Sequence, residues 1–384
     1  MTTRLRRVAA LAACLVWTQP ASAGSPDAPT CTLPHPALAR GFSLTGWFDE
    51  PVARSPDLTT LKALRARGML HVRLPIAAES VMARFSPPEA IEATRRRIGA
   101  GVDTLLVLGY AVVVDLHGGE RLADLFRRDP NAARDAVIQA WTVLGPLVEA
   151  RAPRGVMAEV LNEPPLDDAT WATMQREIVA SLRRVAPTAT LVVSTGGPQR
   201  VERLTAATPI DDPATVYAVH YYDPMVFTHQ GADWLAPDPI AALGGVPFPI
   251  RRADPRLAAL AGPLKARGAT AAADYVASLA DRSFGIEDVA RHMGALAAWS
   301  RATGRPVVIG EFGVYRGAAR AEERRAWLAA VAGAAETACL GWTHWEFRDG
   351  FGFVDGSTGR IDEATLSSLL KPGATGAEGT EKPR

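Results

Sequence analysis

Two glutamates follow apolar runs in short motifs that could carry acid–base and nucleophilic chemistry. Residues 160–164 read VLNEP and contain Asn162 and Glu163, and residues 309–313 read IGEFG with Glu311 at the centre. Either motif alone is equally typical of a polar strand end before a turn. Two carboxyl groups held about 5–5.5 Å apart can cleave a glycosidic bond with retention, one attacking the anomeric carbon and one protonating the leaving oxygen. A wider separation would admit a water molecule and invert the anomer.

Further polar and aromatic side chains follow other apolar runs of the chain. They are Trp47, Arg73, His117, His220, Tyr222 and Trp345. If they share one face with the two glutamates, that face gathers carboxylates, imidazoles, a guanidinium and indoles. Stability does not require such a group, so the set is a candidate active site.

Eight short β-rich runs alternate with segments of helical periodicity and would position these residues. The runs begin near Gly41, Leu70, Ala111, Gly155, Thr190, Val216, Pro306 and Cys339. Runs such as 112–114 are apolar at consecutive positions, as strands buried on both faces should be. Residues 57–67 and 131–150 are examples of the helical segments. Eight such units predict a single (β/α)8 barrel, the TIM-barrel fold, with its site at the carboxyl ends of the strands.

In such a barrel the fourth and seventh strands lie across the mouth, so Glu163 and Glu311 can meet over one substrate. A doubly wound open sheet is the alternative architecture, but no glycine-rich dinucleotide fingerprint follows the first run to support it.

One interval along the chain is longer than the others. The sixth and seventh runs begin 90 residues apart, against 26 to 44 for the rest. We therefore expect an insertion over about 223–287 that projects over the active face, including a proline-rich stretch at 236–255, and then a helix over 286–303. The catalytic domain is expected over 32–370, and the Gly-, Pro- and charge-rich residues 371–384 are expected to be a disordered tail.

From about Arg40 to Asp355 the ordered motifs resemble glycoside hydrolase family 5, the cellulase-type family of retaining barrel enzymes. The resemblance rests on HVRLP with Arg73, DLHGG with His117, LNEP with Asn162 and Glu163, HYYDP with His220 and Tyr222, IGEFG with Glu311, and THWEF with Trp345. The run 227–234, together with 351–353, resembles a bacterial subgroup that acts on β-1,4-glucans and sometimes mannans.

The resemblance implies that Glu311 is the nucleophile and Glu163 the general acid/base. We expect Arg73 and Tyr222 to hold Glu311 ionised by charge and hydrogen bonding. Glu163 must begin protonated, and we expect the charge of Glu311 to raise the pKa of Glu163.

The other matched residues would bind the sugar. Asn162 suits the 2-hydroxyl, and Trp345 offers an apolar floor for the ring. His117 and His220 either contact ring hydroxyls or orient other groups. For each aromatic platform along a cleft, packing is the alternative role; the candidates are Trp47, Trp234, Phe227 and Phe351.

Composition and charge limit the other partners. The chain has 384 residues, 48% of them hydrophobic and 22% charged, with a formal net charge of +1. Nothing in this balance suggests nucleic acid or an anionic membrane as a partner. We expect a monomer that acts on a β-linked polysaccharide or oligosaccharide without a cofactor.

Residues 1–23 have the pattern of a signal peptide. Three arginines precede an apolar run and the small residues Ala21, Ser22 and Ala23. The apolar run is too short for the alternative, a membrane anchor, which needs about 20 residues. Cleavage after Ala23 would remove three arginines and no acid, taking the net charge from +1 to −2, and would make the protein secreted or periplasmic.

Two cysteines, Cys31 and Cys339, would remain after cleavage removes Cys14. An exported pair can form a disulfide, and two separate buried thiols are the alternative. The chain has no CxxC motif and no Cys/His cluster with zinc spacing, so no metal site is expected.

The most specific expectation is retaining endo-hydrolysis of a β-1,4-glucan. Mannan, xyloglucan and bacterial exopolysaccharide are alternative substrates, and transglycosylation is an alternative outcome of the same covalent intermediate. A non-catalytic glycan-binding barrel would usually have lost one carboxylate. A metal-dependent barrel hydrolase using His117, His220 and a carboxylate would need further ligands, where the chain has Gly46, Trp47 and Phe48.

Overall fold

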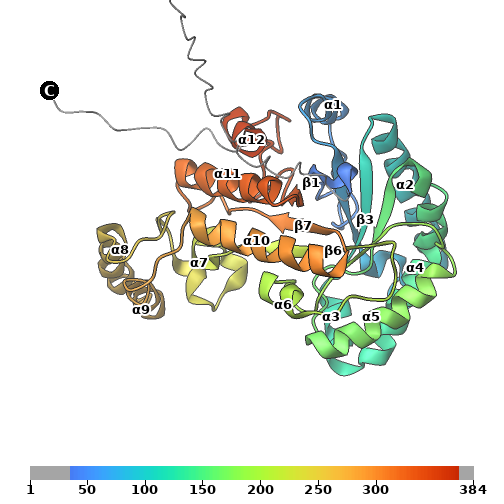
Figure 1. Cartoon of the computed structure of the whole chain (residues 1–384), viewed down its shortest axis with the longest axis horizontal. Coiled ribbons are helices and arrows are strands. Elements are labelled where there is room, and N and C mark those ends of the chain that lie inside the picture. Colours follow the sequence, from blue (N-terminus) through green and yellow to red (C-terminus); the bar gives the residue numbers. More distant parts are fainter. Residues whose placement is uncertain (1–34, 372–384) are drawn as a thin grey trace, which may run out of the picture. The chain divides into compact units, whose positions relative to one another are not determined.

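Eight parallel strands close into a barrel in chain order, which confirms the (β/α)8 fold. The computed structural model describes residues 35–371 (Figure 1). The strands are β1 (Arg40–Ser43), β2 (His71–Ala77), β3 (Ala111–His117), β4 (Val156–Glu159), β5 (Leu191–Val193), β6 (Thr215–Tyr221), β7 (Val307–Phe312) and β8 (Gly341–His344). Pairing of β1 with β8, with Gly41 opposite Thr343, completes the ring.

Helices connect successive strands and cover the outside of the barrel. They are α1 (Leu58–Ala66), α2 (Pro88–Val107), α3 (Glu120–Arg128), α4 (Pro130–Glu149), α5 (Asp168–Arg183), α6 (Val201–Ala206), α10 (Ile286–Thr303), α11 (Ala321–Thr337) and α12 (Glu363–Leu370). The helices predicted over 57–67, 131–150 and 286–303 are therefore confirmed to within one residue at each end. Helix α1 begins where the carboxylate of Asp57 accepts the N–H groups of Thr59 and Thr60, which would otherwise lack partners.

The inside of the barrel has an apolar layer below a polar one. Val113, Met157 and Val216 belong to a small buried cluster contributed by the strands. Side chains two residues further along a strand point the same way, so Asp115 and Glu159 come next, opposite each other in the β3–β4 register. The polar layer is thus at the carboxyl ends of the strands, where the site was expected.

The long segment between β6 and β7 folds into short helices with a small core of its own. It contains α7 (Met225–Thr228), η4 (Asp233–Leu235), η5 (Pro239–Ala242), α8 (Pro255–Ala266) and α9 (Thr270–Ala277). Buried members of this core include Ile240, Leu257, Leu264 and Val276. Because the segment packs on itself, it can hold its first residues rigidly beside the mouth of the barrel.

Several predictions concern residues outside the described part. These are the signal peptide at 1–23, Cys31, and the disordered tail apart from Lys371. Within residues 35–371, no helix is both long and apolar enough to cross a membrane. Cys339 is disulfide-bonded. The two other cysteines, Cys14 and Cys31, both lie outside the described residues, so the pairing of Cys339 with Cys31 stays a prediction.

We expect peptide mapping of the unreduced mature protein to recover Cys31 and Cys339 in one cross-linked fragment. A bridge that closes so long a loop should stabilise the fold by about 2–4 kcal/mol, so Cys339→Ser should lower the melting temperature. Reduction of the wild-type protein should reproduce that loss, while the Ser variant should not respond to the reductant. Two free thiols in the mature protein would exclude the bridge.

Candidate active site

The guanidinium of Arg73, on β2, is the centre of a buried ion cluster. Its Nε and Nη2 donate to the two oxygens of Glu159 at 2.7 and 2.9 Å. Its Nη1 donates to Glu311 at 2.7 Å, and Nη2 also reaches Asn162 Oδ1 at 2.8 Å and Asp115 Oδ2 at 3.0 Å. The side chain of Arg73 is 1% exposed. One cation therefore fixes groups from β3, β4 and β7 in a single arrangement.

Burial and neighbouring charges shift the pKa values of Asp115 and Glu159, the two deeper acids of this cluster, in opposite directions. Burial raises the pKa of Glu159, and the neighbouring charge of Asp115 adds to the effect against the opposing charge of Arg73. Burial opposes ionisation of Asp115 as well, but Arg73 and the hydrogen bond from His117 lower the pKa of Asp115. Asp115 is thus held as the carboxylate that orients His117, whose Nδ1 lies 2.9 Å away.

Glu311, on β7, is held by two donors and turned inward by an irregularity in the sheet. Arg73 donates to Oε1, and the hydroxyl of Tyr222 donates to Oε2 at 2.8 Å. Burial and the charge of Glu311 raise the pKa of Tyr222, so the phenol keeps its proton and donates. The β6–β7 register shifts by one residue at Gly310, and this shift brings Glu311 opposite His220. The predicted contacts of Arg73 and Tyr222 with Glu311 are both present.

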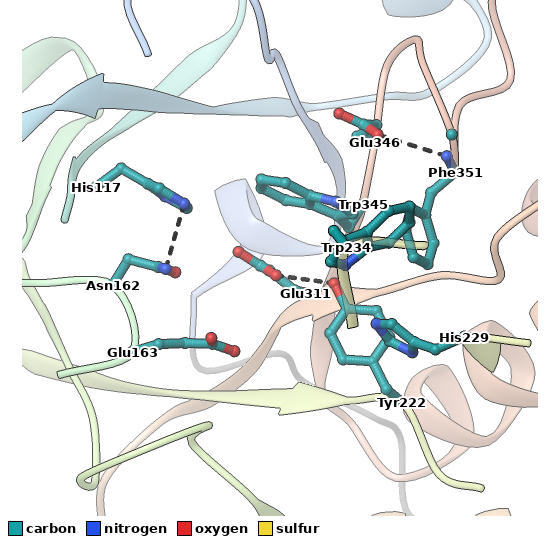
Figure 2. Close-up of a pocket in the computed structure, with 11 residues that line it drawn as sticks. His117, Asn162, Glu163, Tyr222, His229, Trp234, Glu311, Trp345, Glu346 and Phe351 are labelled. Carbon is teal, nitrogen blue, oxygen red and sulfur yellow. Dashed lines mark hydrogen bonds between the residues drawn. The ribbon is translucent and has the colours of Figure 1, made fainter. Parts of the chain in front are cut away.

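Glu163 lies just beyond β4 in a conformation that non-glycine residues rarely adopt. Its φ is +37°, and its N–H donates to the side-chain oxygen of Gln199 at 3.0 Å. Its carboxylate is 2.8 Å from Nδ1 of His220, which in turn lies 3.5 Å from Glu311. Carboxylate oxygens of Glu163 and Glu311 lie within 4.8 Å of each other. Figure 2 shows both carboxylates pointing into one cavity.

The expectation that the charge of Glu311 raises the pKa of Glu163 is wrong for this arrangement. Burial would raise the pKa of Glu163, but the hydrogen bond and positive charge of His220 lower it. Burial would lower the pKa of His220, yet the charges of Glu311 and Glu163 raise it. The two shifts therefore favour the proton on the imidazole of His220 and the charge on Glu163, 2.8 Å away.

Most of the predicted residues surround a single cavity of about 370 Å3 (Figure 2). It is lined by His117, Asn162, Glu163, Tyr222, His229, Trp234, Glu311, Trp345, Glu346, Gly350 and Phe351. The rings of His117 and Trp345, both part of this lining, stack nearly parallel with centroids 5.8 Å apart. Arg73 and His220 do not line this cavity. Arg73 contacts Glu311 and His220 contacts Glu163, so each orients one of the lining carboxylates.

Two of the four proposed aromatic platforms are not in the cavity. The indole of Trp47 stacks on Phe48 at 4.7 Å and faces Gly101 of α2, so Trp47 packs against the outer helix layer. Phe227 is fully buried against Phe248 in the core. The loops after β1 and β6 turn these rings away from the mouth. Trp234, by contrast, lines the cavity and is 55% exposed.

Three functional side chains were missed from the sequence. Glu159 was read as part of an apolar strand, although an acid inside a buried strand is itself a signal of a partner. Glu346 directly follows Trp345, and the hydroxyl of Thr45 donates to it at 2.6 Å. His229 packs edge-on against Tyr222 at 4.8 Å, and burial lowers its pKa to about 4, so its ring is neutral. His229 lies in the run 227–234 that resembles the bacterial subgroup, but that resemblance assigned no role to its side chain.

Glu346 makes the stability of the protein depend on pH. Burial, with the negative charges of Asp349 and Asp49, raises the pKa of Glu346 to about 8. An unfolded chain would ionise it near 4.5, so the stabilisation by its neutral form is complete below pH 4.5 and is lost as pH rises to about 8. Glu346→Gln should remove this loss, making the variant less pH-sensitive than wild type by a few kcal/mol, measured as melting temperatures between pH 5 and 9.

Glu89→Gln, which removes a carboxylate exposed in the first turn of α2, is the control and should leave the wild-type profile unchanged. If Glu346→Gln kept the wild-type dependence, the carboxyl of Glu346 would be ionised in the folded protein throughout.

Comparisons with known proteins agree with this geometry. The model of the cellulase family, glycosyl hydrolase family 5, matches residues 34–348. Endoglucanase 3 of Fibrobacter succinogenes is 22% identical over 365 residues, which cover 86% of this chain and 52% of that protein. Endoglucanase C of Acetivibrio thermocellus is 27% identical over 210 residues, covering 50% of this chain and 60% of that protein. The chain thus spans about half the length of the first of these relatives.

Solved structures share the fold. A hyperthermophilic endo-β-1,4-glucanase in complex with substrate superposes with a TM-score of 0.72 at 21% identity, covering 88% of this chain and 97% of that one. Thermotoga maritima Cel5A in complex with mannotriose gives 0.69 at 22% identity, covering 87% and 98%. Since the family model spans the barrel from the residues before β1 to those after β8, the chain belongs to glycosyl hydrolase family 5.

Proposed function

We propose that this protein is a retaining endo-β-1,4-glucanase in which Glu311 is the nucleophile and Glu163 the acid/base. The observation that carries the proposal is the approach of the two carboxylates to within 4.8 Å. Retaining glycosidases hold their carboxyl groups at about 5–5.5 Å, and inverting enzymes at about 6.5–9.5 Å. The closer spacing favours covalent attack over the direct attack of water.

The contacts of Glu311 suit the attacking group. Its two oxygens accept hydrogen bonds from Arg73 and Tyr222, which fix the direction of the carboxyl group. As the oxygen of Glu311 bonds to the anomeric carbon, its negative charge disappears and the glycosidic bond breaks. The leaving oxygen takes a proton from Glu163, which the imidazolium of His220, 2.8 Å away, can supply.

The second half of the reaction reverses these roles. Glu163, now ionised, accepts a proton from a water molecule that attacks the anomeric carbon, and Glu311 leaves as a carboxylate. Asn162 would bind the 2-hydroxyl, because Arg73 already occupies its side-chain oxygen and leaves its amide N–H groups facing the cavity wall at His117. The indole of Trp345 would lie beneath the same sugar ring.

The choice of β-1,4-glucan rests on the named relatives, several of which are endoglucanases. Mannan is the second candidate, because mannotriose is bound in a structure with the same fold. Secretion or export to a periplasm is part of the proposal and depends on residues 1–23. Hydrolysis of a labelled panel of cello-, manno- and xyloglucan oligosaccharides tests the substrate, with fastest cleavage of cello-oligosaccharides expected.

Substitution of the two carboxylates should separate their roles. Glu311→Gln should lower kcat by several orders of magnitude because it removes the nucleophile. Glu163→Ala should still form the intermediate from aryl glycosides with good leaving groups, and azide should restore its turnover with a β-glycosyl azide as product. A β-glycosyl azide formed by Glu311→Ala, with an α-glycosyl azide from Glu163→Ala, would show that the assignments are reversed.

Trp234 should contribute binding rather than chemistry. Loss of an indole that covers one face of a pyranose should cost about 1–2 kcal/mol. Trp234→Ala should therefore raise KM about 5- to 30-fold with a small change in kcat, and the effect should grow from disaccharide to hexasaccharide. Trp47→Ala is the control, because that indole lies outside the cavity. A uniform loss at every length, with a lowered melting temperature, would show that Trp234 only packs the insertion.

A further inference from the structure

A second cavity of about 240 Å3 adjoins the site on one side of Glu163. It shares Glu163, Tyr222, His229 and Trp234 with the main cavity, so the two adjoin along these four side chains. Neither Glu311 nor Trp345 lines it. The remaining wall comes from His220 on β6, from the loop after β5 and from the start of the insertion.

The positions of Glu163 and Glu311 indicate on which side of the cleaved bond this cavity lies. The nucleophile must face the sugar whose anomeric carbon it attacks, and the acid must face the oxygen that leaves. A cavity that contacts the acid but not the nucleophile is therefore on the leaving-group side. The main cavity, with Glu311, Trp345 and Glu346, holds the sugar that becomes bonded to the enzyme.

A charged pair closes the far wall of the second cavity. Arg200 and Asp223 approach to 3.5 Å, with side chains 39% and 29% exposed, so both keep polar atoms free for a ligand. Asp223 is fixed by its carbonyl, which accepts the indole N–H of Trp327 at 3.0 Å. Arg200 follows Gln199, whose side-chain oxygen accepts the N–H of Glu163, so the side chain of Gln199 links this loop to the acid.

The composition of the wall indicates an uncharged sugar. The pair offers donors from Arg200 and acceptors from Asp223, which together match adjacent hydroxyl groups that donate and accept. An anionic sugar would face Asp223 as well as Arg200, so the site has no net charge to attract it. Pro198, Met225 and Leu235 supply the apolar surface that the faces of a pyranose ring need.

We propose that this cavity is the leaving-group subsite and that Arg200 and Asp223 determine its specificity by binding adjacent hydroxyls of a neutral sugar. The proposal rests on the proposed function, because it takes its direction from the roles of Glu163 and Glu311. It also assigns this cavity to the acceptor in any transglycosylation, since the acceptor must enter where the leaving group departed.

Arg200→Ala tests the subsite by comparing two substrates with the same glycone. One is a cello-oligosaccharide, whose leaving group is a sugar, and the other is an aryl glycoside, whose leaving group is a phenol. We expect kcat/KM for the oligosaccharide to fall about ten-fold, the scale of one hydrogen bond to a charged group, and to fall several-fold more than for the aryl glycoside. Arg203→Ala is the matched control, because Arg203 lies one turn along α6 and pairs with Asp168 outside the cavity.

A second readout uses the aryl glycoside with added cellobiose as acceptor. Arg200→Ala should lower the ratio of transglycosylation to hydrolysis about ten-fold, because water needs no subsite. Equal losses on both substrates, with an unchanged ratio, would overturn the subsite and show that Arg200 acts by holding Gln199 and Glu163. Faster wild-type cleavage of an oligosaccharide with a uronic acid on the leaving side would overturn the neutral-sugar assignment. Wild-type protein inactive on both substrates would instead overturn the proposed function.

Discussion

The guanidinium of Arg73 lies inside the barrel against the carboxylates of Asp115, Glu159 and Glu311, and the geometry of the site depends on this ion cluster. Burying charges costs several kcal/mol per ion, and the cost is offset only when geometry and hydrogen bonding are nearly complete. Each strand that contributes a carboxylate is consequently held in one register relative to β2. The barrel supplies the apolar layer beneath, formed by Val113, Met157 and their neighbours, which keeps water from below. The cluster at the carboxyl ends of the strands thus fixes the direction of the Glu311 side chain.

The alternation of side chains along buried strands explains what the sequence could and could not predict. Runs that are apolar at consecutive positions identified the strands, and their polar ends identified Arg73, Glu163 and Glu311. The same runs concealed Glu159, because a strand buried on both faces gives no pattern to separate the residues inside the barrel from those beneath the helices. Its position four residues before Glu163 and directly opposite Asp115 becomes meaningful only once the β3–β4 register is known.

Loops after the strands were less predictable than the strands themselves. Trp47 and Trp345 both follow strand ends, yet one packs against α2 and the other forms the wall of the cavity. The direction of a side chain beyond a strand depends on the backbone angles of the loop, and these are set by distant contacts. Glu163 is the clearest case, since its φ of +37° is maintained by Gln199, itself at a positive φ and 36 residues away in sequence. No local rule predicts such a conformation for a glutamate.

The position of His220 makes its protonation depend on the charges of the two catalytic carboxylates. It is fully buried between Glu163 and Glu311, and its raised pKa depends on their charges. In the proposed mechanism the charge of Glu311 disappears when its oxygen bonds to a sugar, and this lowers the pKa of His220. When Glu163 has given its proton to the leaving group, its carboxylate is negatively charged, and this charge raises the pKa of His220. These two changes have opposite effects on the pKa of His220. The imidazole of His220 can therefore exchange a proton with Glu163 at a position that is buried from solvent.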